Sequence, residues 1–196
     1  MKPLAIVVLA MLLATPAGGV AAEISVPDTD GWYSWAVTAG SAGRSSCCYH
    51  WRSGSARIQG CALDGGDGGF NIGDCDLDSD ELRVYIKVRG GNVSQIRALS
   101  ADCPVTARSE IRDIGKVDIA TSIDWLRNHL GDEKDDSSEV LAAIAMHAGD
   151  SATDALIDIV EDRDSSRGYR EEALFWLVQS GSDSAFRYLD EILSAR

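Results

Sequence analysis

The chain has 196 residues, 45% of them hydrophobic and 25% charged, which is an ordinary composition for a globular protein. Its formal net charge at pH 7 is -13, which argues against nucleic acid and anionic lipid surfaces as partners. Most of this charge lies late in the chain: residues 117–196 contain 18 acidic and 7 basic side chains, whereas residues 23–116 contain 13 and 10. The simpler interpretation is a set of solvated helix faces, and the other is a surface for a basic partner.

Residues 1–22 have the pattern of an export signal. A positive start is followed by an apolar run over residues 4–14 and a small-residue cleavage site over residues 20–22. The apolar run is too short to span a bilayer, although an uncleaved N-terminal anchor is the alternative interpretation. We therefore expect a periplasmic or secreted protein that does not span the membrane and is cleaved between Ala22 and Glu23.

Patterns typical of β-strands dominate residues 23–104. Residues 82–88 alternate apolar and polar side chains, as expected of an antiparallel strand with one buried face. Two glycines then lead into residues 93–99, which predicts a hairpin. The sequence thus predicts a small antiparallel, Cys- and Trp-rich β-domain over residues 23–104 and an extended connector over residues 105–117. Three shorter segments supply further expected strands: 32–37, 47–51 and 56–63.

All five cysteines fall in this predicted domain, and clustered cysteines in an exported chain indicate disulfide bonds. Cys47 and Cys48 are adjacent, so on a strand they point to opposite faces and take different partners, for which Cys61 and Cys103 are the candidates. The odd cysteine, Cys75, lies in an Asp- and Gly-rich loop and is the candidate free thiol. A disulfide between the two adjacent cysteines is the alternative, and the sequence lacks the Cys-x-x-Cys motif of a thiol-redox protein.

Four alternating carboxylates precede residues 82–88 and have the oxygen pattern of a calcium-binding loop. Counted from the first of them, position six is Ser79 where an EF-hand needs glycine, and position twelve is Tyr85 where it needs glutamate. A non-standard calcium site that includes Asp64 and Asp67 is one interpretation, and a solvated turn entering the strand is the simpler one. The four carboxylates are Asp74, Asp76, Asp78 and Asp80.

The sequence contains no phosphate-binding loop, nucleophile elbow or His-x-x-x-His motif, so it predicts no catalytic residue and no cofactor. His50 lies close to Cys48, which leaves an enzyme or a thiol-, metal- or pigment-handling module as the alternative function of this region. The neighbouring aromatic residues are expected in the domain core rather than on a ligand-binding shelf. They are Trp32, Tyr33, Trp35, Tyr49 and Trp51.

Helical periodicity fills residues 118–196, where we expect one leading helix and two helix pairs. The pairs break at Gly149 and Gly181, which lie 32 residues apart, and this period is typical of an α-solenoid. The run over residues 173–178 is apolar nearly all round, so its helix is expected to lie between two layers of neighbours.

Residues 170–181 and 185–193 together resemble a HEAT-type repeat, with an Ala-Leu-x-x-Leu core, a glycine turn and a leucine-rich second helix. Residues 141–162 fit more loosely. The whole chain is similar to exported bacterial proteins that pair a Cys/Trp-rich N-terminal region with HEAT-like repeats, here over about 137–195. The resemblance implies a protein-binding scaffold without shared catalytic residues, and one related branch, the bilin lyases, uses such repeats around a pigment.

Together these features predict an α+β protein in which a small disulfide-stapled antiparallel β-domain precedes a short α-solenoid. The expected function is not enzymatic: the acidic repeat binds a partner protein or peptide that carries basic groups. The candidate partner-binding side chains are carboxylates of the last helix pair, namely Glu171, Glu172, Asp190 and Glu191.

The export signal gives the first testable prediction. N-terminal sequencing of protein recovered from outside the cytoplasm should begin at Glu23, because residues 20–22 satisfy the small-residue rule of the cleaving peptidase. A chain that still begins at Met1, or that carries a lipid, would contradict the predicted compartment.

Overall fold

The computed structural model describes residues 24–52, 55–58, 60–65, 69–71, 77–130 and 134–194. The predicted signal peptide lies outside the described residues, and so do Asp67, Asp74, Cys75 and Asp76. Within these ranges the chain is an α+β protein, as predicted. In this part of the chain, no helix has both the length and the apolar character needed to cross a membrane.

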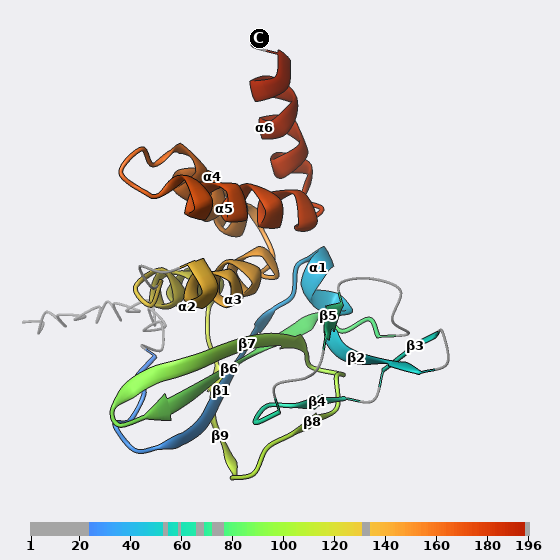
Figure 1. Cartoon of the computed structure of the whole chain (residues 1–196), viewed down its shortest axis with the longest axis vertical. Coiled ribbons are helices and arrows are strands. Elements are labelled where there is room, and N and C mark those ends of the chain that lie inside the picture. The colour runs from blue at the N-terminus through green and yellow to red at the C-terminus, as the bar shows by residue number, and fades with distance from the viewer. Residues whose placement is uncertain are drawn as a thin grey trace, which may run out of the picture.

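A four-stranded sheet with the order β7-β6-β1-β9 forms the centre of the molecule (Figure 1). β6 (Glu81–Arg89) and β7 (Asn92–Ser100) form the predicted hairpin, and β1 (Gly31–Thr38) pairs antiparallel with β6. β9 (Ile111–Lys116) runs parallel to β1. The sheet is therefore mixed rather than wholly antiparallel as predicted, and residues assigned to the connector form one of its two edge strands.

The sequence pattern did not show β9 because a bulge interrupts its pairing. The register between β1 and β9 shifts after Ser34, so Asp113 and Gly115 face successive residues of β1 and Ile114 is skipped. The apolar residues Ile111 and Ile114 are consequently spaced by three rather than by two, which hides the strand from a search for simple alternation.

Smaller elements surround one end of the sheet. β2 lies between β3 and β5 in a three-stranded antiparallel sheet, β4 and β8 form a short parallel pair, and the one-turn helix α1 follows β1. Their bounds are α1 (Ser41–Arg44), β2 (Cys47–Arg52), β3 (Ser55–Ile58), β4 (Cys61–Ala62), β5 (Gly69–Asn71) and β8 (Val105–Thr106).

Five longer helices follow in layers: α2 and α3 lie next to the sheet, α4 and α5 beyond them, and α6 outermost (Figure 1). Gly149 and Gly181 separate the members of the pairs α3–α4 and α5–α6, and their φ angles of 85° and 64° favour glycine. The predicted helix pairs are thus present, while the HEAT-type solenoid stays a prediction. The bounds are α2 (Ile119–Arg127), α3 (Lys134–Ala145), α4 (Asp150–Glu161), α5 (Arg167–Gln179) and α6 (Asp183–Ser194).

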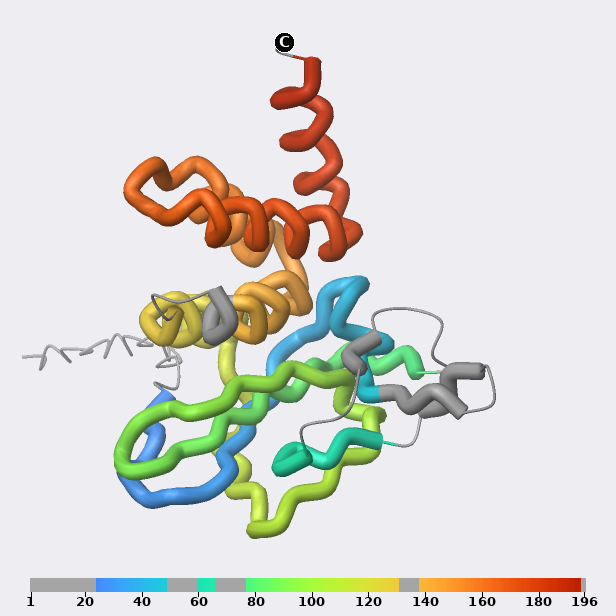
Figure 2. The backbone as a smooth tube through the Cα atoms, viewed as in Figure 1, coloured from blue at the N-terminus to red at the C-terminus, as the bar shows by residue number. Residues whose placement is uncertain are grey.

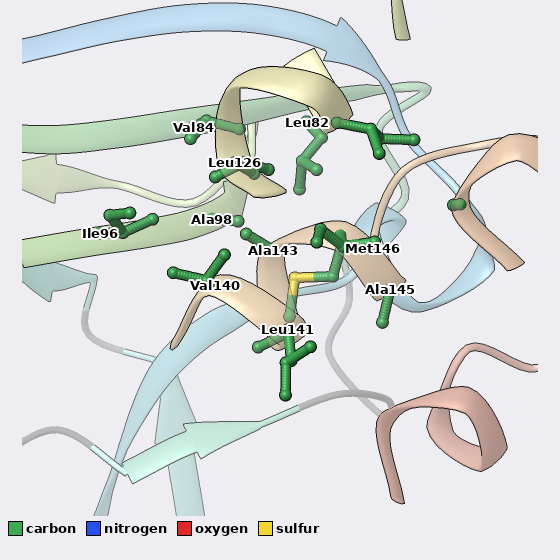
Figure 3. Packing of buried hydrophobic residues seen from close by; sticks show 14 of the residues in the cluster. Leu82, Val84, Ile96, Ala98, Leu126, Val140, Leu141, Ala143, Ala145 and Met146 are labelled. Atoms are coloured by element: carbon green, nitrogen blue, oxygen red, sulfur yellow. The ribbon is translucent and has the colours of Figure 1, made fainter. Parts of the chain in front are cut away.

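One hydrophobic cluster joins the sheet to the helices. Figure 3 shows Leu82 and Val84 of β6 on the sheet side of this cluster, and Leu126 of α2 with Val140 and Leu141 of α3 on the helix side. All five side chains are at most 1% exposed. The division of the chain into a β-domain and a helical module stays a prediction. The strands and the helices nevertheless share this core.

The other face of the sheet is covered as well, which explains why β1 is buried at nearly every position. Trp32, Tyr85 and Leu99 pack there against the disulfide-bonded segments. A sheet that is covered on both faces shows continuous rather than alternating burial. Trp32 and its neighbours Tyr33 and Trp35 are at most 1% exposed, so these aromatic residues belong to the core, as expected.

A chain of buried hydrogen bonds crosses from β1 to α2 and α3. Trp35 Nε1 donates to Ser122 Oγ at 2.8 Å, Ser122 Oγ lies 2.8 Å from His147 Nε2, and His147 Nδ1 lies 2.7 Å from the carbonyl oxygen of Ala143. A carbonyl can only accept, so Nδ1 carries the imidazole proton and the Ser122 hydroxyl donates to Nε2. Burial lowers the pKa of His147 to about 4, so the ring is neutral at pH 7.

The backbone after β1 also lies in close contact with the backbone at the end of α3. The Gly40 N–H donates to the carbonyl oxygen of Met146 at 2.8 Å. A Cβ atom at Gly40 would lie 2.5 Å from the carbonyl oxygen of His147, and one at Gly43 would lie 2.5 Å from that of Met146. Glycine at both positions therefore lets the end of β1 and the start of α1 approach the turn between α3 and α4.

We expect Ser122→Ala to destabilise the fold by about 1–3 kcal/mol, because it leaves the Trp35 N–H and His147 Nε2 unpaired in the core. Urea unfolding followed by circular dichroism at pH 7 measures this loss. Ser25→Ala, at an exposed position, is the matched control and should change stability by less than about 0.5 kcal/mol. Equal losses in the two variants would contradict a structural role for the bonded chain.

The same imidazole predicts a dependence of stability on pH. Because the pKa of His147 falls from 6.5 in the unfolded chain to about 4 in the fold, the unfolded state binds the extra proton more tightly. The contribution of neutral His147 to the free energy of unfolding is complete above pH 6.5 and declines as the pH falls toward 4. The total loss of unfolding free energy is about 3 kcal/mol. The slope of unfolding free energy against pH over this window should be smaller in His147→Gln than in the parent. Identical slopes in the two proteins would show that protonation of His147 does not cause the pH dependence.

Candidate functional site

The exposed large hydrophobic side chains of the described residues all lie on the last two helices. On α6, Phe186 and Leu193 are seven residues apart and share a helix face, and Ile192 lies on the side that begins with Ala185; on α5, Phe175 and Val178 are spaced by three. We call these two sets the apolar stripes of α5 and α6. Their exposed members are Phe175 (51%), Val178 (46%), Phe186 (59%), Ile192 (37%) and Leu193 (69%).

The stripes are exposed because α6 leaves the helix layers instead of covering α5. The inner face of α5, with Ala173, Trp176 and Leu177, is buried against its neighbours. α6 touches α4 and α5 near its first turn, where Ala185 is buried, and it then extends away to the C-terminal tip (Figure 2). The prediction that the helix of residues 173–178 lies between two layers is therefore wrong, since Phe175 and Val178 are exposed on its outer face.

The four predicted partner-binding carboxylates have different surroundings. Glu171 is exposed and pairs with Arg167 one helical turn earlier at 2.7 Å. Glu172 accepts hydrogen bonds from Ser138 Oγ at 2.7 Å and Trp176 Nε1 at 3.0 Å, so it holds α5 to α3. Asp190 and Glu191 are both exposed on α6, Asp190 next to the face of Phe186 and Leu193 and Glu191 on the opposite side of the helix. The structure thus leaves three of the four carboxylates at the surface.

Both predicted disulfides are present, as Cys47–Cys103 and Cys48–Cys61. Cys47, Cys61 and Cys103 are at most 4% exposed, whereas Cys48 is half-buried. The adjacent cysteines of β2 take different partners, as strand geometry predicts. Since Cys75 lies outside the described residues, its role as the free thiol stays a prediction.

A groove of about 250 Å³ opens beside Cys48, where β7 meets α3 and α5. Arg97 and Glu139 line it and form an ion pair, and burial lowers the pKa of the arginine. Glu139 also accepts a hydrogen bond from the Ile96 N–H at 3.3 Å, which occupies a donor on the outer edge of β7. Trp176 supplies an aromatic wall. Sequence reasoning missed this groove, because its residues come from four separate segments without a shared motif.

The described half of the proposed calcium loop is bonded to an arginine. Arg44 donates to Asp78 at 2.6 Å and also pairs with Asp80, and the arginine hydrogen bond lowers the pKa of Asp78. Asp64 is occupied as well: it accepts from the Arg108 N–H at 2.7 Å and from Trp32 Nε1 at 3.1 Å. These carboxylates are bonded within the protein, which favours the simpler interpretation of a solvated turn that enters the strand.

Asp64 also pairs with Lys87, whose ammonium group lies 5.2 Å from the centre of the Trp32 ring. The Arg108 N–H, Lys87 and Trp32 together hold the pKa of Asp64 well below its usual value. The carboxylate therefore stays charged and fastens the segment after β4 to the central sheet. The side chains of Tyr49, His50 and Trp51 lie outside those described, so the proposed pairing of His50 with a cysteine stays untested.

Comparison of the chain with protein-family models, with curated proteins and with solved structures finds no match. Conclusions about function therefore depend on the geometry of the apolar stripes, their carboxylates and the groove beside Cys48.

Proposed function

We propose that this is an exported, non-enzymatic interaction protein that binds a partner through the apolar stripes of α5 and α6. Among the described residues, the exposed large apolar side chains are concentrated on these two helices. Exposed apolar clusters on soluble proteins mark interaction sites more often than isolated ones do. The periplasm or the exterior of the cell is the compartment that fits the disulfides.

The HEAT-like character of the helix pairs supports the same function. In a repeat array each unit buries its apolar face on its neighbour, and the last unit needs a polar outer face to stay soluble. In this structure α6 keeps Phe186, Ile192 and Leu193 exposed. An exposed apolar helix face of this kind offers a partner the surface on which a further helix would pack.

The charges beside the stripes suggest the chemistry of the partner. Glu171, Asp190 and Glu191 lie at the surface of the same two helices, within a part of the chain that carries 18 acidic and 7 basic residues. Opposite charge steers association and suppresses partners of like charge. We therefore propose an amphipathic helical segment with apolar and basic side chains as the ligand.

A designed pair of amphipathic peptides tests this function. One peptide combines leucine with lysine and the other, matched in length and apolar positions, combines leucine with glutamate. Fluorescence anisotropy with residues 23–196 should detect binding of the lysine peptide and weaker binding of the glutamate peptide. Binding of the lysine peptide should weaken as salt is added, because exposed charges are screened within about 8 Å at 0.15 M.

Substitutions on α6 and a distant control complete the test. Phe186→Ser with Leu193→Ser should abolish binding, and Asp190→Lys, next to Phe186 on the helix, should weaken it mainly through slower association. Glu110→Lys makes the same charge change at an exposed site in the loop before β9 and should leave binding unchanged. If the double variant keeps native circular dichroism and still binds like the parent, the stripes are not the docking surface.

A further inference from the structure

The two disulfides lie in contact with each other. Cys103 Sγ is 3.8 Å from Cys61 Sγ, although these atoms belong to different disulfides. The sulfur atoms of Cys47, Cys61 and Cys103 all lie within 4.8 Å of one another. A thiolate formed at Cys61 would therefore be in van der Waals contact with the other disulfide, and exchange between disulfides proceeds by attack of a thiolate on a disulfide sulfur.

One of the four disulfide-bonded cysteines borders the groove. Cys48 lines the groove beside β7 and is half-buried, while its partner Cys61 is 3% exposed. An external thiolate would therefore reach Cys48 Sγ first. The groove, at about 250 Å³, is smaller than the roughly 300–1,000 Å³ of drug-sized sites and suits a small thiol or a single cysteine side chain.

The leaving sulfur has a hydrogen-bond donor in position. The backbone N–H of Cys48 donates to Cys61 Sγ at 2.8 Å. A hydrogen bond to the charged form of an acid stabilises that form, so this N–H would stabilise Cys61 as a thiolate. A more stable thiolate is a better leaving group in thiol–disulfide exchange. Attack at Cys48 with departure of Cys61 is thus favoured by access and by hydrogen bonding together.

We propose that the two disulfides form a thiol–disulfide relay for an external dithiol, an activity beyond the proposed binding function and independent of the stripes on α5 and α6. A thiolate of the dithiol bonds to Cys48 Sγ as the Cys48–Cys61 bond breaks, and the electron pair of that bond goes to Cys61. The Cys61 thiolate then bonds to Cys103 Sγ as the Cys47–Cys103 bond breaks, and Cys47 leaves as a thiolate.

The relay ends with the second thiol of the dithiol, which attacks the mixed disulfide and releases Cys48. The dithiol loses two electrons and two protons and becomes a cyclic disulfide. The protein gains both electrons, and the two protons end on Cys47 and Cys48, while Cys61–Cys103 is the remaining disulfide. The outcome is a pair of adjacent free thiols on β2 and a new covalent link between β4 and the residues that precede β8.

Partial reduction of the folded protein tests the relay. Protein with Cys75→Ser, which removes the fifth cysteine, is treated with one equivalent of dithiothreitol at pH 8 and trapped with excess N-ethylmaleimide. Trypsin then separates the cysteines into three peptides: residues 45–52 with Cys47 and Cys48, residues 58–83 with Cys61, and residues 98–108 with Cys103. Mass spectrometry identifies which peptides stay cross-linked.

The relay predicts two maleimides on peptide 45–52 and a cross-link between peptides 58–83 and 98–108. Simple reduction of the accessible disulfide predicts one maleimide on peptide 45–52, which stays linked to 98–108, and this result overturns the proposal. Protein that keeps both original disulfides under these conditions overturns it as well, because Cys48 is then not reached.

Cys61→Ser is the matched control, since it removes the internal nucleophile and leaves Cys47–Cys103 in place. In this variant the Cys47–Cys103 bond should open at least about tenfold more slowly than in the parent, because an intramolecular attack has a high effective concentration. Equal rates of opening in both proteins would show that Cys61 does not act on that bond. The peptide mapping is decisive even if this variant fails to fold.

Discussion

The buried hydrogen bonds from Trp35 through Ser122 to His147 fix how the helices lie on the central sheet. They join β1 to α2 and to the end of α3 at a point where all three side chains are at most 3% exposed. Buried polar groups must find hydrogen-bond partners, so this series of hydrogen bonds permits one placement of the helices on the sheet. The neutral tautomer with a proton on Nδ1 completes it, because Ala143 offers only an acceptor.

Both candidate surfaces follow from that placement. With α2 and α3 fixed on one face of the sheet, the disulfide-bonded segments cover the opposite face, and Cys48 lies beside the groove between β7, α3 and α5. The helices beyond α3 touch the sheet less and less, so α6 ends far from the core (Figure 1). The molecule therefore carries its two disulfides near the edge of the sheet and exposed apolar side chains on the outermost helix.

Local patterns in the sequence predicted the elements better than their arrangement. The sequence predicted the strand at residues 82–88, the helix breaks at Gly149 and Gly181, and the two disulfides. Each of these depends on neighbours in sequence or on simple strand geometry. β9 was missed because a bulge disturbs its period. The exposure of Phe175 and the groove at Cys48 depend on where α6 and β7 lie, which no short motif encodes.

Native-state hydrogen exchange tests most directly whether the sheet and the first helices form one unit. Amides of β1, β6, α2 and α3 should exchange with one common opening free energy, because their side chains share a core and the Ser122 hydroxyl links them. Ser122→Ala should lower that free energy by the same amount in all four elements. Exchange of α2 and α3 at a clearly lower free energy than β1 and β6 would contradict the account, because it would show that the helices open while the sheet stays folded.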